Sequence, residues 1–146
     1  MATRDSVSAA GAERVASAYM ASFQPDSALV VLNKTLNQEP TFKLWSLLGD
    51  LQVMEKHFDE AYKAFSECVK LSPGEARPYM MLGYCALELN QPDLAMTHLT
   101  VAAANEAYAE RAQMLIQRAQ IMRAAPTPEP ADSSGSGGGP PSLSGK

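Results

Sequence analysis

The sequence predicts an all-α fold, an α-solenoid of three helix pairs closed by a C-terminal capping helix, and two observations lead to it. First, Ala, Leu, Met, Glu, Gln and Lys dominate, and the alternation of polar and apolar residues typical of strands is absent. Second, "WSLLGDLQV" at Trp45 returns as "YMMLGYCAL" at Tyr79, which is 34 positions later. This period is typical of helix pairs that stack, because one pair cannot bury its apolar face alone.

The first pair, residues 9–41, is the weakest copy of the pattern. It keeps Ala28 and Pro40, but Ala12 and Ala16 stand where the later copies have an aromatic residue and a glycine. We expect the proline to end the second helix and to set the angle into the next pair.

The second pair, residues 42–75, carries the pattern most fully, and the third, residues 76–109, keeps most of it. The pattern residues are Trp45, Leu48, Gly49, Phe58, Ala61, Phe65 and Pro73 in the second, and Tyr79, Leu82, Gly83, Ala95 and Leu99 in the third. The glycines and alanines are small where we expect the partner helix to cross close to the backbone, and the large residues fill the space between helices.

An acidic residue recurs where each second helix begins. Asp26, Asp59 and Asp93 occupy matching positions in the three copies. A carboxylate there is expected to accept hydrogen bonds from backbone N–H groups and to complement the helix dipole.

The last pair needs a cover, and residues 108–123 are predicted to supply it as the capping helix. Its apolar face consists of Tyr108, Ala112, Leu115, Ile116, Ala119 and Met122. Beyond Arg123 the composition changes abruptly to Pro, Gly and Ser. Residues 124–146 are therefore predicted to be a disordered tail, and residues 1–8 a flexible N-terminus.

The pattern of an aromatic residue, Leu-Gly, Ala, a large apolar residue and Pro resembles the tetratricopeptide repeat. The resemblance covers roughly residues 9–123 and implies a domain that binds protein segments. It also implies that the first helix of each pair lines a concave groove. The positions that would face a partner are Glu13, Ser17, Met20, Lys43, Ser46, Asp50, Val53, Met54, Arg77, Met80, Tyr84, Leu87 and Glu88.

Those positions predict an apolar central strip in the groove, with a partner segment that carries hydrophobic anchors. Methionine side chains repack around varied partners, which suits an adaptable groove. The alternative is that Met20, Met80 and Met81 only fill space between helices, because methionine is also a common gap-filler.

Other classes of function find little support in the composition. The formal net charge is −4, and no cluster of Lys and Arg indicates a nucleic-acid partner. No run of roughly 18 apolar residues predicts membrane insertion, and no apolar segment near the N-terminus predicts a secretory signal, so the expected location is cytoplasmic. Cys68, Cys85, His57 and His98 lack metal-ligand spacing, and no catalytic motif is present. We therefore expect no metal, no cofactor and no enzymatic activity.

Small size, acidic balance and three repeats resemble the bacterial chaperones that hold translocator subunits of type III secretion. That resemblance implies a cytoplasmic chaperone or adaptor with an extended, hydrophobic partner segment in its groove. The alternative is a structural scaffold, or a subunit that forms homo-oligomers through convex-face or end-to-end contacts.

Overall fold

A computed structural model of the chain describes residues 8–125, and in this part of the chain the predicted all-α solenoid is confirmed: there are seven helices and no strand. The helices are α1 (Ala9–Ala21), α2 (Pro25–Gln38), α3 (Phe42–Met54), α4 (Phe58–Leu71), α5 (Ala76–Glu88), α6 (Pro92–Ala103) and α7 (Glu106–Ala124). The predicted flexible N-terminus and disordered tail fall almost entirely on residues 1–7 and 126–146, which lie outside the described residues.

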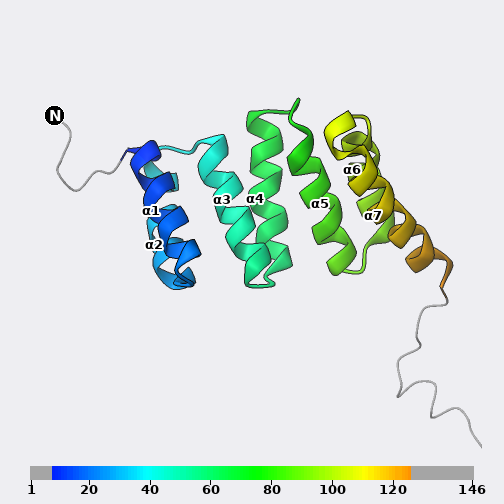
Figure 1. Cartoon of the computed structure of the whole chain (residues 1–146), viewed down its shortest axis with the longest axis horizontal. Coiled ribbons are helices and arrows are strands. Elements are labelled where there is room, and N and C mark those ends of the chain that lie inside the picture. Colours follow the sequence, from blue (N-terminus) through cyan, green and yellow to red (C-terminus); the bar gives the residue numbers. More distant parts are fainter. Residues whose placement is uncertain (1–7, 126–146) are drawn as a thin grey trace, which may run out of the picture.

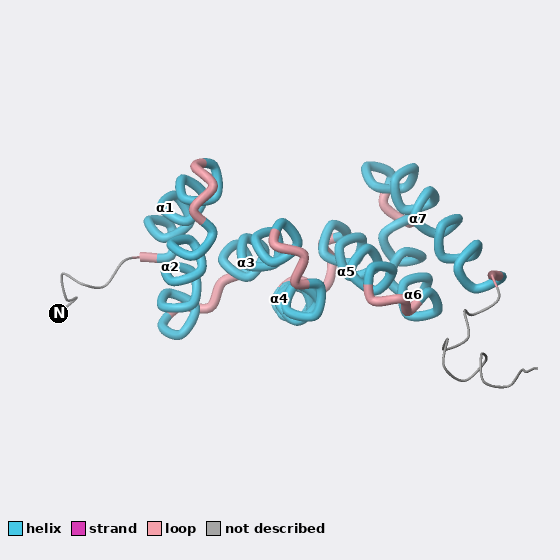
Figure 2. The backbone as a smooth tube through the Cα atoms, turned by 90° about the horizontal axis from the view of Figure 1, so that it is seen from below, coloured by secondary structure: helices cyan, strands magenta, loops and turns pink. Residues whose placement is uncertain are grey.

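The helices form a curved row in which each pair stacks on the next (Figure 1). The pair α1–α2 lies at one end of the row, and α7 lies at the other. When the molecule is turned by 90° about the horizontal axis of Figure 1, the curve of the row is seen (Figure 2). The helices α1, α3, α5 and α7 lie on the hollow side of this curve, and α2, α4 and α6 lie on the opposite side. We call the first set the inner helices and the second set the outer helices.

Among the described helices, side-chain caps occur only at inner helices, and the inner helix α5, whose N-cap is Glu75, has none. In α1, α3 and α7 the side chains of Ser8, Thr41 and Asn105 accept a hydrogen bond from a backbone N–H of the first turn. The outer helices have no side-chain cap bond at their N-cap residues. The expected bonds from Asp26, Asp59 and Asp93 are not formed, because each aspartate is the second residue inside its helix, where its charge still complements the dipole.

The turn inside each pair repeats in detail. Phe23, Lys56 and Asn90 have the left-handed φ values 59°, 62° and 61°. The N–H of the following residue returns to a carbonyl five residues earlier, at 2.8 Å in all three turns. The three pairs therefore share one turn geometry, although only the third has at this position a residue, asparagine, that commonly adopts it.

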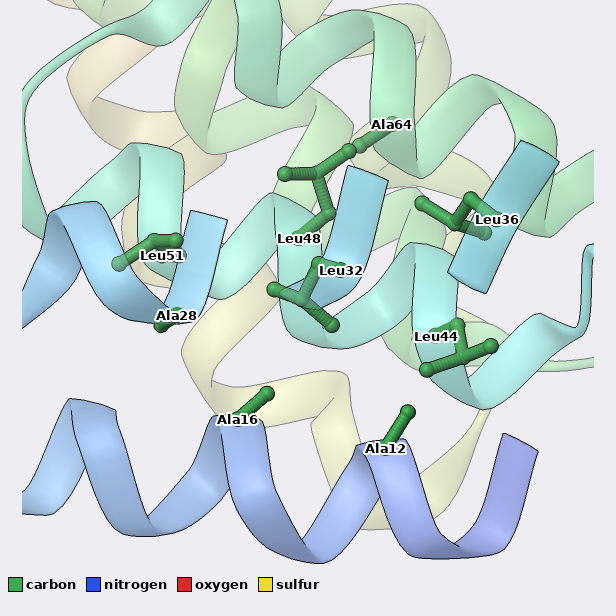
Figure 3. Close-up of a cluster of buried hydrophobic side chains, with 9 residues drawn as sticks. All are labelled: Ala12, Ala16, Ala28, Leu32, Leu36, Leu44, Leu48, Leu51 and Ala64. Carbon is green, nitrogen blue, oxygen red and sulfur yellow. The ribbon is translucent and has the colours of Figure 1, made fainter. Parts of the chain in front are cut away.

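The core is built where inner and outer helices cross. One buried cluster joins the first pair, α3 and α4, with Ala12 and Ala16 projecting from α1 (Figure 3); its other members are Ala28, Leu32, Leu36, Leu44, Leu48, Leu51 and Ala64. The close approach predicted at the glycines is confirmed: a Cβ on Gly49 would lie 2.6 Å from the Phe65 ring, and one on Gly83 would lie 2.4 Å from Leu99. Both large side chains are fully buried.

A histidine joins the second and third pairs. The Tyr62 hydroxyl of α4 lies 2.7 Å from Nε2 of His98 in α6, in a part-buried hydrogen bond. The rings of Tyr62 and Tyr79 lie 5.7 Å and 6.3 Å from the imidazole. Burial lowers the pKa of His98 below its ordinary value of 6.5.

This environment predicts a pH-dependent stability. The folded chain favours the neutral imidazole, so the unfolded chain takes up a proton first as the pH falls through about 6.5. The contribution of neutral His98 to the free energy of unfolding is therefore complete above about pH 6.5 and is lost as the pH falls below this value. We expect His98→Gln to reduce the fall in unfolding free energy between neutral and mildly acidic pH, measured by denaturant titration at each pH. The control His57→Gln changes an exposed residue and should keep the wild-type slope; equal slopes for wild type and His98→Gln would contradict the assignment.

Candidate protein-binding groove

An arginine crosses the hollow side of the row between the second and third pairs. One Nη of Arg77, on α5, donates to the Asp50 carboxylate of α3 at 2.8 Å, and the other donates to the Ser46 hydroxyl at 3.2 Å. The guanidinium carbon also lies 6.0 Å from the centre of the Phe65 ring. The structure thus brings together three of the residues predicted for the groove, all of them partly exposed.

The equivalent position one repeat earlier is also basic, but among the described residues it makes no ion pair like that of Arg77. Lys43 precedes Arg77 by 34 residues, and it lines an open depression of about 540 Å³ together with Glu13 and Ser17. Arg14 and Ala18 complete the lining. This depression places three more predicted residues on the concave side, where Lys43 and Arg14 bring positive charge beside Glu13.

The capping helix contributes to this side, which the sequence analysis missed. Arg118 of α7 donates to the Glu88 carboxylate of α5 at 2.8 Å. Arg111 of α7 follows Arg77 by 34 residues and is exposed. Lys43, Arg77 and Arg111 thus form a basic series on three successive inner helices. Applying the repeat once more to residues 108–123 would have found Arg111, but those residues were interpreted only as a cover.

Two predicted groove residues are instead core residues, and this corrects the predicted apolar strip. Met80 and Leu87 are 4% and 2% exposed, and they belong to a cluster with Ala112 and Ala119 of α7. They face the next inner helix along the row, so α7 covers them. The alternative that methionine fills space between helices therefore holds for Met80.

The remaining apolar positions are divided between packing and exposure. Met20 is partly buried against the first cluster, the one drawn in Figure 3, and Val53 against the middle cluster, which consists of Ala61, Phe65, Cys68, Leu82 and Cys85. Met54 is 50% exposed at the end of α3. Tyr84 is partly exposed, and its ring meets Phe58 edge-on, with centroids 5.9 Å apart. Met54 is thus the most exposed apolar side chain of the predicted set, and Tyr84 is partly available to a partner.

A second hollow lies among α2, α3 and α4, on the side of the outer helices. Its volume is about 570 Å³, and its walls include Leu29, Trp45 and Leu48. Its polar residues are Asn33, Gln52, His57, Glu60, Lys63 and Glu67. The concave side is therefore not the only recessed surface of the molecule.

Neither a cluster of metal-ligating side chains nor an exposed thiol is found within the described residues. Within residues 8–125 no group of three or more His, Cys, Asp or Glu side chains is placed to hold a metal ion. Cys68 and Cys85 are free, buried thiols, and burial raises the pKa of each to about 12, so both stay protonated. None of the helices in the same range has the length and apolar character needed to cross a membrane.

Comparison with known families gives one match. Residues 52–119, from the last turn of α3 into α7, match the tetratricopeptide repeat family. The match supports the resemblance drawn from the repeat pattern, and it leaves α1 and α2 outside its range. Repeats of this family generally mediate protein–protein interactions and are typically not enzymes. No curated protein matches the chain.

Proposed function

We propose that this chain, a helical solenoid whose residues 52–119 match the tetratricopeptide repeat, binds a protein segment in the groove along α1, α3 and α5. The observation that carries the proposal is the polar network of Ser46, Asp50 and Arg77 on the hollow side. Polar side chains that bridge two helices there give a fixed, partly exposed surface, which is a basis for selective recognition.

The groove chemistry supports a partner segment with both polar and apolar contacts. Lys43 and the residues around Arg77 can receive charged or hydrogen-bonding groups. Met54 and Tyr84 can receive hydrophobic anchors, although the apolar surface is smaller than the sequence predicted because Met80 and Leu87 are covered. The partner is therefore a segment with spaced hydrophobic anchors among polar residues.

The most concrete role is that of a cytoplasmic chaperone or adaptor, similar to the chaperones of type III secretion translocators. Its support is the small size of 146 residues, the net charge of −4 and the three stacked pairs. In this role the groove holds an exposed segment of a partner protein until that partner is delivered.

The test is capture of partners from a native lysate with two variants that carry the same charge change on opposite sides. Lys43→Glu, combined with Tyr84→Ser, alters the groove, and Lys63→Glu alters an exposed lysine of α4 in the hollow of the outer helices. Both should keep the wild-type circular dichroism. We expect a partner that is lost with the groove variant and retained with Lys63→Glu.

The opposite result, loss only with Lys63→Glu, would move the binding surface to the outer helices. If both variants retained the partner equally, binding in the groove would also be contradicted. Met80→Asp is unsuitable for this test, because a carboxylate placed at a 4% exposed position would unfold the third pair rather than probe the surface.

A further inference from the structure

The apolar contact that holds the capping helix is repeated on the capping helix itself. Met80 and Leu87 of α5 are buried in the cluster that includes α7. The residues 34 positions later are Met114 and Ile121, on α7. Their exposed fractions are 64% and 69%. Because they stand seven residues apart, they share one face of the helix, on the side away from α5 and α6.

The face of α7 that covers Met80 and Leu87 shows what a covering helix looks like. It presents Ala112 and Ala119, both fully buried, with Ile116 between them. The equivalent residues of α5, Leu82 and Cys85, are buried against the preceding pair in the same way. At the same positions α3 buries Leu44, Leu48 and Leu51 against the first pair, so each later inner helix packs on its predecessor through this face, with smaller residues in α7.

The first inner helix carries the same face with nothing packed on it among the described residues. Its members are Gly11, Val15 and Ala18, at the repeat positions of Ala112, Ile116 and Ala119. Val15 is 42% exposed, whereas its equivalents Leu48 and Leu82 are 8% and 2% exposed. The reason is that α1 is the first helix of the described row and has no helix pair before it.

The continuation of the chain after α7 does not have the composition of a covering helix. Residues 126–146 contain five prolines and a single large apolar residue, Leu143. Charged residues flank both faces. Arg14 lies beside Val15, and Glu110 and Arg111 lie one turn before Met114; all three are exposed, and none forms an ion pair within residues 8–125, so Arg14 of one copy can pair with Glu110 of the next.

We propose that copies of this chain associate end to end, with Gly11, Val15 and Ala18 of one copy packed on Met114 and Ile121 of the next. In this contact α1 of one copy packs on α7 of the other, in the way that α7 packs on α5 within one chain. The two surfaces are different, so the contact does not close on itself and allows longer assemblies. The junction has no counterpart of α6 beneath the incoming helix, so association is weak and depends on concentration.

The association can be measured by sedimentation velocity from low micromolar to near-millimolar protein. We expect the weight-average mass of the wild type to rise with concentration. Val15→Glu places a charge in the apolar face of α1, and Met114→Glu with Ile121→Glu does the same to the face of α7. Each variant alone should therefore remain a monomer. The matched control is Val30→Glu, which changes a 66% exposed valine on α2 and should associate like the wild type.

Mixing the two defective variants is the decisive experiment. Each retains the surface that the other lacks, so an equimolar mixture should form a heterodimer with one intact junction and grow no further. A mixture that stays monomeric, or a wild type that stays monomeric throughout, overturns the proposal. Association that survives Val15→Glu but is lost with the α7 variant would instead show a symmetric α7–α7 contact, which also overturns it. The substituted residues Val15, Met114 and Ile121 are not changed in the binding test, so the two outcomes can be distinguished; Ala18 alone is shared with the depression beside Lys43.

Discussion

Phe65→Ala is expected to destabilise the chain by about 3–5 kcal/mol, the range for truncating a buried phenylalanine. The Phe65 side chain is fully buried and fills the space that Gly49 leaves open. Its ring also lies under the guanidinium of Arg77. Because whole domains are stable by only about 5–15 kcal/mol, this substitution removes a large share of the total. Urea denaturation followed by circular dichroism measures the loss.

Phe23→Ala is the matched control for that measurement. The Phe23 side chain is 85% exposed in the turn between α1 and α2. Removing it should change the free energy of unfolding by no more than about 0.5 kcal/mol. If both substitutions had similar effects, the central position of Phe65 in the middle cluster would be refuted.

Gly83→Ala has the second large expected effect, although alanine is the better helix former. The new methyl group would lie 2.4 Å from the Leu99 side chain, much closer than two carbon atoms can pack. Overpacking of this kind costs roughly 1–3 kcal/mol, against a gain of about 1 kcal/mol in helix propensity. We therefore expect a lower melting temperature and a lower denaturation midpoint.

Two further variants separate overpacking from other causes. Gly74→Ala adds the same methyl group where nothing lies within 4 Å, and it should be nearly neutral. Leu99→Ala removes the Cγ and Cδ atoms that clash with the new methyl group, so the effects of Gly83→Ala and Leu99→Ala on the free energy of unfolding should be less than additive in a double-mutant cycle. Additive effects would locate the strain elsewhere.

The sequence predicted the packing of the fold because packing repeats with the period. Gly49 and Gly83 are each opposed by the large residue that the pattern places opposite them, Phe65 and Leu99. Each repeat buries its signature residues against its neighbours, so one copy explains the next. The residues of the core could therefore be named before the structure.

The groove was less predictable, because the period fixes the direction of a side chain but not what covers it. Met80 and Leu87 face the next inner helix along the row, and they are buried because α7 lies over them. The contact of Arg77 with Asp50 depends on the spacing of α3 and α5, which no local pattern encodes. The aspartates at the outer helices show the same limit, since each lies only two positions after the N-cap of its helix.

Trp45 gives the molecule an optical probe at a defined place. It is the single tryptophan of the chain, and its ring packs against both the first cluster and the middle cluster. Its emission therefore follows the junction between the first two pairs, whereas far-ultraviolet ellipticity follows every helix. An event that frees α7 would lower the ellipticity and leave the tryptophan spectrum unchanged, so the two ends of the molecule can be followed separately without a label.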